Sequence, residues 1–181
     1  MRKLIMWNII TLDGYFEGAK SWELPFHELI WGPELERISI EQLVSASCLI
    51  FGRITYEGMA AHWQSAEGEV ARLMNSIPKF VFSGTLHEAE WENAHILNGN
   101  PVSEINQMKL EGEGDMYIFG SSRLSHSLIQ NKVFDEYRIG IAPVFLGEGR
   151  KLFEQGIAGR LAHTDTQSLS SGCVILKYKS L

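Results

Sequence analysis

The sequence predicts a three-layer α/β domain, with a mixed and mainly parallel sheet, helices on both of its faces and a C-terminal antiparallel hairpin. Three observations support this prediction. Short, continuously apolar runs, typical of strands buried on both faces, alternate with helical patterns up to residue 131. Strand patterns dominate the rest of the chain. Glycine ends two of the apolar runs, at Gly52 and Gly120, directly before a helical pattern.

The first half of the chain divides into alternating strands and helices. Residues 2–10 predict a buried strand, in which Asn8 interrupts an otherwise apolar stretch, and a polar, glycine-containing loop follows it. A helix is expected over residues 33–46, because Pro33 suits a first helical position and apolar side chains repeat there at helical spacing. These side chains are Leu35, Ile38, Leu43 and Val44. The elements expected next are a strand at 48–51, helices at 53–62 and 67–76, and strands at 78–82 and 94–97.

The second half of the chain changes from alternation to strands. A helix is expected at 102–110, a strand at 116–119 and a helix at 121–131. Residues 160–169 and 173–179 predict a closing hairpin around the turn at 170–172. No repeat and no linker divides the sequence, so residues 1–181 are expected to form one domain. A strand with one wetter face is expected between the helix at 121–131 and this hairpin. In it, Tyr137, Ile139 and Ile141 alternate with Glu136, Arg138 and Gly140.

Composition restricts the class of protein. The 181 residues carry a formal net charge of -6 and no run of Lys or Arg, which argues against nucleic acid as a partner. No apolar stretch approaches membrane-spanning length, and the apolar N-terminus is too short for an export signal. Cys48 and Cys173 each sit in an apolar run, and so few cysteines are typical of a reducing compartment. We therefore expect a cytoplasmic protein without a nucleic-acid or membrane partner.

Two strand ends in the first half carry groups that suit phosphate. Gly52 permits close approach of a ligand to the backbone, and the helix that begins there offers unpaired N–H groups and a positive dipole end. Arg53 adds a guanidinium, although a tight turn beside a solvated arginine explains these residues equally well. Ser83 and Thr85 follow the next strand, where their hydroxyls suit a phosphate or ribose oxygen or simply form a turn.

A third strand end lies in the second half. Gly120 ends the strand at 116–119, and Ser121 or Ser122 either caps the next helix or donates to a diphosphate. The three ends are expected along one edge of a parallel sheet, which is where α/β proteins bind ligands. This pattern is not the G-x-G-x-x-G fingerprint, so a standard Rossmann site is not expected.

Other chemistries lack their motifs. The six histidines show no pairing at metal-ligand spacing and the cysteines form no C-x-x-C, so no metal site is expected. Neither a G-x-S-x-G elbow nor a Walker A motif is present. The G-x-G at 147–149 is expected in a flexible loop beside the pocket. Trp22, Trp31 and Trp63 are candidates for a flat pocket wall, with core packing as the alternative, preferred for Trp63.

Six motifs occur in order, at residues 12–15 (LDGY), 52–57 (GRITYE), 82–86 (FSGTL), 119–124 (FGSSRL), 134–137 (FDEY) and 143–149 (PVFLGEG). Their order and spacing resemble the bacterial family related to the C-terminal reductase domain of the bifunctional riboflavin-biosynthesis deaminase/reductase. That family shares the dihydrofolate reductase fold, and the resemblance runs from about residue 3 to the C-terminus. It implies NADPH as hydride donor, a C=N or C=O group in a small pyrimidine- or pterin-like substrate, and a homodimer.

The resemblance also implies roles for individual residues. Gly52, Arg53 and Thr55 would contact the adenosine side of the dinucleotide and its phosphates. Ser83 and Thr85 would lie near the 2′-phosphate or ribose. The remaining implied contacts are with the diphosphate, from Gly120, Ser121 and Ser122, and with nicotinamide and substrate, from the loop of Asp13 and Gly14.

Two departures from the family affect these implications. Many relatives carry arginine where this chain has Gly84, so NADH is not excluded as the cofactor. Dihydrofolate reductases also place a carboxylate on the helix after the first strand, and neither Glu23 nor Glu28 aligns with it, which argues against folate. Asp13 is the expected catalytic group, although an Asp-Gly turn explains it equally well. The alternatives are a dinucleotide-binding module without turnover and a structural dimer with a vestigial site.

Overall fold

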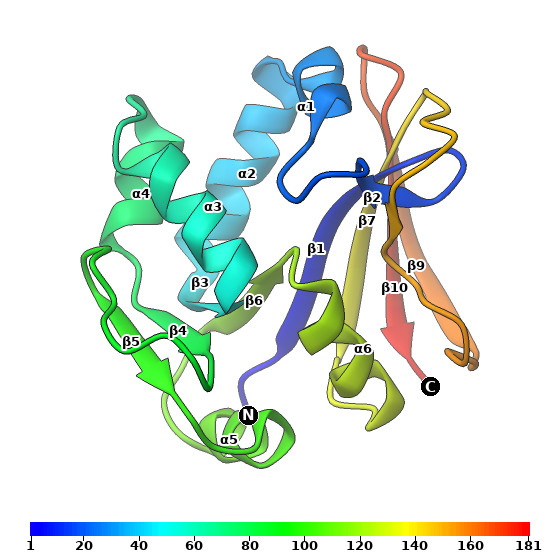
Figure 1. The fold of residues 1–181 in the computed structure, drawn as a ribbon. Helices are drawn as coiled ribbons and strands as arrows, with labels where there is room; N and C mark the ends of the chain where they lie inside the picture. Colours follow the sequence, from blue (N-terminus) through cyan, green and yellow to red (C-terminus); the bar gives the residue numbers. More distant parts are fainter.

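The computed structural model describes residues 1–181 and contains one eight-stranded sheet with helices on both faces (Figure 1). The strands lie in the order β5 (Ala94–Leu97), β4 (Lys79–Phe82), β3 (Ala46–Gly52), β6 (Asp115–Phe119), β1 (Leu4–Thr11), β7 (Glu136–Ala142), β10 (Val174–Ser180) and β9 (Leu161–Ser168). Neighbours from β5 to β7 pair in parallel, whereas β10 runs antiparallel to both β7 and β9. The predicted fold class and the closing hairpin are therefore confirmed.

Helices cover the two faces of the sheet. One face carries α2 (Pro33–Ser45), α3 (Arg53–Trp63) and α4 (Glu69–Ser76), with the short α1 (Pro25–Ile30) beside them, and the other carries α5 (Pro101–Leu110) and α6 (Ser122–Gln130) (Figure 1). No helix combines the length and the apolar character needed to cross a bilayer.

The central strand β1 serves both layers because its side chains alternate. Leu4 and Met6 pack in one apolar cluster with Ile105 of α5 and Leu128 of α6. Ile5, which points the other way, packs in a second cluster with residues of α2, α3 and α4. All three β1 side chains are fully buried, so both helical layers are anchored to the same strand.

The parallel pairing brings the predicted strand ends to one edge of the sheet. Gly52 at the end of β3 lies opposite Phe82 of β4, and Trp7 of β1 lies opposite Phe119 of β6. The residues that follow β3, β4 and β6 therefore emerge at the same edge. This placement is what the sequence analysis expects for a ligand site.

Three short elements were not predicted from the sequence. β2 (Tyr15–Glu17) and β8 (Arg150–Lys151) pair as a separate two-stranded sheet, inside segments expected to be loops. The helix α1 has six residues, too few for a periodic pattern. Tertiary pairing, rather than local propensity, explains β2 and β8.

Two details of the predicted burial were wrong. Val44 was expected on the apolar face of α2 but is 68% exposed. The second face of β7 was expected to be wet, yet Glu136 is buried because Arg138 donates to it at 2.6 Å under the cover of α2. Arg138 also donates to Tyr117 at 2.9 Å and to Gln42 at 3.2 Å, so a polar network fills that face.

We expect Asp135→Ala to lower the free energy of unfolding by about 3 kcal/mol, because its carboxylate compensates a buried charge. Asp135 Oδ2 lies 2.6 Å from Lys109 Nζ, whose side chain is 9% exposed, and accepts a hydrogen bond from the Leu4 N–H at 2.7 Å. Urea unfolding measures the change. Glu41→Gln is the control, since it removes an exposed helical ion pair with Arg37 and should cost about 0.3–0.5 kcal/mol. Equal losses in the two variants would contradict this account.

Candidate active site

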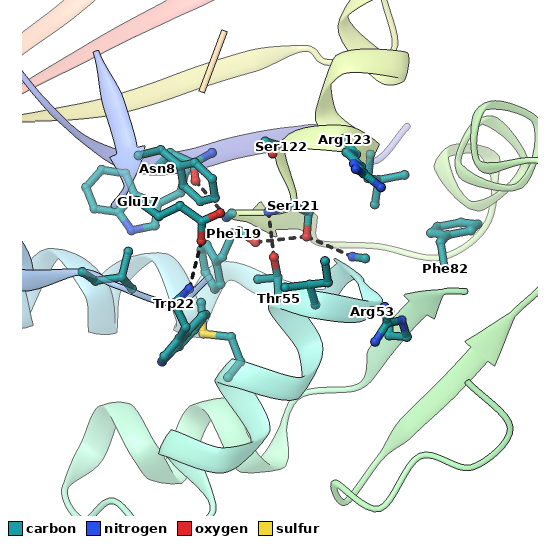
Figure 2. A pocket seen from close by; sticks show the side chains of 18 of the residues that line it. Asn8, Glu17, Trp22, Arg53, Thr55, Phe82, Phe119, Ser121, Ser122 and Arg123 are labelled. Carbon is teal, nitrogen blue, oxygen red and sulfur yellow. Dashed lines mark hydrogen bonds between the residues drawn. The ribbon is translucent and has the colours of Figure 1, made fainter. Parts of the chain in front are cut away.

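A cleft of about 630 Å³ opens at the edge of the sheet where β1, β3, β4 and β6 end. Its lining comes from these strands and the end of β5, from α1, α2, α3 and α4, from the starts of α5 and α6, from the segment between β1 and α1, and from Arg150 of β8. Figure 2 shows its central part, with Arg53 and Arg123 toward the side of Phe82, and Glu17 and Trp22 on the opposite side. We call these the arginine end and the Glu17 end of the cleft.

Direct hydrogen bonds join the junctions after β3 and β6. The Ser121 N–H donates to Thr55 Oγ1 at 2.9 Å, and the Gly52 N–H donates to Ser121 Oγ at 2.9 Å (Figure 2). Thr55 and Ser121 are both buried. The two helices α3 and α6 therefore begin side by side at the floor of the cleft.

Gly120 allows this close approach. Its φ of +62° lies in the left-handed region, and an added Cβ would come within 3.0 Å of the Thr55 methyl group. The Asn8 side chain fixes the same residue from β1, because its Oδ1 accepts a hydrogen bond from the Gly120 N–H at 2.8 Å. Any larger residue at position 120 would push the two helix starts apart.

The starts of α3 and α6 present free backbone donors. Neither helix has a side-chain cap, so its first N–H groups keep their hydrogen-bonding capacity at the positive end of the helix dipole. Arg53 is paired with Glu57 at 3.0 Å, whereas Arg123 makes no ion pair and is exposed. Helix N-termini with arginines at their side are suited to bind phosphate groups.

The junction after β4 is a hydroxyl-stabilised turn. Ser83 Oγ accepts hydrogen bonds from the Thr85 N–H at 3.1 Å and from the Leu86 N–H at 2.9 Å. Ser83 therefore forms the turn that was one of its two alternatives, and it also lines the cleft. Its hydroxyl proton remains free to donate to a ligand oxygen.

Two buried amide side chains in the lining have spare donors. Asn8 Nδ2 and Gln42 Nε2 have no hydrogen-bond partner, although both side chains are at least nine-tenths buried. Their oxygens accept hydrogen bonds from the Gly120 N–H and from Arg138, which fixes the orientation of each amide. A ligand acceptor at either nitrogen would remove the cost of an unsatisfied buried donor.

Glu17 is the carboxylate that lines the cleft. It is 4% exposed, and its oxygens accept from the Trp22 N–H at 3.0 Å and pair with Arg150 Nε at 3.3 Å. A Cβ on Gly149 would overlap the Glu17 carbonyl oxygen, so glycine is required where the loop before β8 crosses β2. Residues 147–149 do not themselves line the cleft, but Gly149 contacts Glu17 and the next residue, Arg150, is part of the lining.

Aromatic rings form much of the remaining wall. Trp22, Trp31 and Trp63 all line the cleft, and Trp7 joins them from β1. The Trp22 ring lies against Gly58 of α3, where a Cβ would overlap it. All three predicted tryptophans therefore line the cleft, and Trp63 also packs against the apolar core, which was the alternative preferred for it.

His27 of α1 also faces this wall as a neutral ring. Burial lowers the pKa of His27 to about 4, so the imidazole is uncharged at neutral pH. His27 therefore contributes a neutral polar ring to the wall, without a positive charge.

Of the ten predicted site residues, eight line the cleft and two do not. The eight are Gly52, Arg53, Thr55, Ser83, Thr85, Gly120, Ser121 and Ser122. Asp13 and Gly14 lie outside the lining, in a turn closed by the Gly14 N–H donating to Thr11 O at 2.9 Å.

The Asp13 carboxylate is used to hold two loops together. It accepts hydrogen bonds from Thr11 Oγ1 at 2.5 Å, from the Leu146 N–H at 3.1 Å and from the Gly147 N–H at 2.8 Å. Burial alone would raise the pKa of Asp13, but these hydrogen bonds outweigh it and lower the pKa to about 2. An ionised, fully engaged carboxylate is suited to positioning the loop rather than to donating a proton.

Sequence reasoning missed Glu17, Asn8, Gln42 and Arg123 as site residues. Arg123 had a visible signal, because it directly follows Ser121 and Ser122 in a motif already singled out. The places of Glu17 and Gln42 depend on the pairing of β2 with β8 and on the packing of α2 over β7, and that of Asn8 depends on the pairing of β1 with β6.

Comparisons with known proteins agree with this geometry. A family model described as the RibD C-terminal domain matches residues 2–176. The uncharacterized protein YyaP of Bacillus subtilis is 30% identical over 185 residues, which span 98% of this chain and 94% of YyaP. The match to the family model confirms the family that the six motifs predict.

Two solved structures share the fold. A putative riboflavin biosynthesis protein from Shewanella sp. PV-4 has a TM-score of 0.77 at 19% identity, covering 99% of this chain and 98% of that one. Dihydrofolate reductase from Enterococcus faecalis, complexed with NADP(H), has a TM-score of 0.66 at 16% identity, covering 98% of this chain and 95% of its own. These likenesses confirm the dihydrofolate-reductase-like fold.

We expect Asp13→Asn to loosen the loop around Leu146 and Gly147 without blocking the cleft. In the native protein the pKa of Asp13 lies below its ordinary 3.8, so the stabilisation is complete above about pH 4 and is lost as the pH falls toward 2. The NMR shifts of the Leu146 and Gly147 amides in the folded protein should titrate with a midpoint near pH 2, and the titration should vanish in the variant. Loss of dinucleotide binding in Asp13→Asn with unchanged loop amides would contradict the positioning role.

Proposed function

The chain belongs to the RibD C-terminal domain family, and from this premise we propose that it is an NADPH-dependent reductase acting on a C=N or C=O group of a small molecule. Family membership supports an oxidoreductase of the reductase type, related to riboflavin biosynthesis. The observation that most supports the proposal is that α3 and α6 begin without side-chain caps and are joined through Thr55 and Ser121 at the floor of the cleft.

The residues at the arginine end fit a phosphorylated dinucleotide. Two helix starts supply backbone donors for a diphosphate, and Ser122 lies beside them in the lining. Arg123 and Arg53 supply guanidinium groups at a cleft edge where Gly84 leaves none. This arrangement supports NADPH over NADH, since a 2′-phosphate needs a cation that a ribose hydroxyl does not.

The residues at the Glu17 end fit the reacting part of the site. A bound dihydronicotinamide supplies a hydride, which is chemistry that no side chain of this protein provides. Asn8 Nδ2 is placed beside Gly120 to donate a hydrogen bond to a carboxamide or carbonyl oxygen. Glu17 has one partner on each oxygen and can hold a water from which the reduced heteroatom takes its proton. Trp22 over Gly58 keeps bulk water away from this end.

Domain organisation, oligomeric state and cellular location are proposed from features outside the cleft. We propose a single domain over residues 1–181 and a homodimer, which the exposed edge strand β9 would favour by leaving backbone groups free to pair. A cytoplasmic location is supported by two free, buried cysteines, whose thiol pKa values burial raises to about 11. A small-molecule substrate follows from the size of the cleft.

We expect Arg123→Ala to weaken NADPH binding about tenfold or more while changing NADH binding little. A charge-assisted hydrogen bond contributes about 1.5–3 kcal/mol, and about 1.4 kcal/mol is tenfold in affinity. Calorimetric titration of both dinucleotides measures the difference. Arg72→Ala is the control, since Arg72 pairs with Glu69 on α4 and does not line the cleft. If Arg123→Ala weakens both dinucleotides equally, the assignment to the 2′-phosphate is wrong.

We expect Glu17→Gln to lower kcat about 100-fold with little change in KM, because the amide holds the proton-donating water poorly. Steady-state kinetics with the best acceptor from a screen of C=N and C=O compounds measures the effect. Glu23→Gln is the matched control, since Glu23 lies on the same loop but outside the lining. An unchanged kcat in Glu17→Gln would remove Glu17 from the mechanism.

A further inference from the structure

The charges of the cleft are unevenly distributed. Two arginines stand at the arginine end, Arg123 without an ion pair and Arg53 paired with Glu57 (Figure 2). At the Glu17 end the one cationic side chain of the lining is Arg150, and it is paired with Glu17. His27 adds no charge there, because burial keeps its ring neutral at pH 7. The Glu17 end therefore offers no unpaired cation to an anionic group.

The surface of that end is aromatic and apolar. Trp7, Trp22 and Trp31 line it, together with Leu24 and Leu35 from around α1 and α2. Indole rings present flat apolar faces that stack on planar ring systems. A phosphate or carboxylate entering this wall would lose its hydration without gaining a cationic partner. The wall therefore favours flat, uncharged molecules.

One polar group that α2 contributes to the lining has a fixed direction. Gln42 is 4% exposed, and Arg138 donates to its Oε1 at 3.2 Å, so the amide cannot rotate to exchange its nitrogen and oxygen without losing that bond. The remaining Nε2 is buried and without a partner in the protein. It is a donor and not an acceptor, which selects for an oxygen or an unprotonated ring nitrogen on the ligand.

Building on the reductase function above, we propose that the Glu17 end binds a flat, uncharged aromatic carbonyl compound whose oxygen accepts a hydrogen bond from Gln42 Nε2, and that it excludes phosphorylated substrates. Reduction of such a compound places one hydride on the carbonyl carbon and one proton on its oxygen, giving the alcohol. The substrate class differs from 5-amino-6-(5-phosphoribosylamino)uracil, which the name of one structurally similar reductase specifies. The reason is the absence of an unpaired cation from this part of the lining.

A matched pair of probes tests the charge preference. Calorimetry with saturating NADP⁺ compares 2-acetylnaphthalene with 6-acetyl-2-naphthoate, which adds one carboxylate to the same ring. We expect the neutral ketone to bind at least tenfold more tightly than the carboxylate, and more tightly than 5-amino-6-(5-phosphoribosylamino)uracil. Equal or tighter binding of either anion would overturn the proposal. The reductase function would fail separately, if neither NADPH nor NADH bound to the protein.

Two variants test the residues that carry the argument. Gln42→Glu keeps the acceptor for Arg138 and removes the donor, so ketone binding should fall about tenfold while NADPH binding stays unchanged. Trp31→Arg places a cation at the rim, where Trp31 is 49% exposed, and should improve binding of the naphthoate relative to the ketone. Unchanged ketone binding in Gln42→Glu, or an unchanged preference in Trp31→Arg, would contradict the assignment.

Discussion

The hydrogen bonds between the junctions after β3 and β6 are the constraint on which the cleft depends. Thr55 and Ser121 are buried, and each accepts a backbone N–H of the other junction at 2.9 Å. These bonds use hydroxyl acceptors and leave the first N–H groups of α3 and α6 facing the cleft. Gly120 makes the contact possible, because its positive φ and missing Cβ let the β6–α6 turn lie against Thr55. This contact holds the β3–α3 and β6–α6 junctions together as the floor of the cleft.

The Glu17 end depends on a different set of contacts, made by loops rather than by the sheet. Asp13 joins the turn after β1 to the loop at Leu146 and Gly147, and Arg150 extends from that second loop to Glu17. Trp22 rests on Gly58, so the same segment closes over α3. The two ends therefore differ in character: one is cationic and built from helix starts, and the other is aromatic, with its cation paired.

Local patterns predicted the sheet, most helices and the strand-end residues, because buried parallel strands and glycine-terminated junctions are visible in the sequence. They predicted Gly52, Ser83 and Gly120 at one edge because parallel pairing requires it. They did not predict β2, β8 or α1, which are too short for periodicity. Glu17 and Gln42 were missed since their roles depend on partners more than 90 residues away, Arg150 and Arg138. Asp13 was expected near the substrate, but its carboxylate accepts hydrogen bonds from Thr11 and from the Gly147 N–H and so holds two loops together.

The most direct test of the central claim is energy transfer from the tryptophans of the wild-type protein to NADPH. Four of the five tryptophans line the cleft, so a dinucleotide bound across the helix starts lies close to several donors. If NADPH binds there, we expect saturable quenching of tryptophan emission with matching sensitised NADPH emission at micromolar concentrations, and a weaker response to NADH. If neither dinucleotide changes the emission and calorimetry detects no binding, the joined helix starts are structural turns and the reductase proposal is wrong.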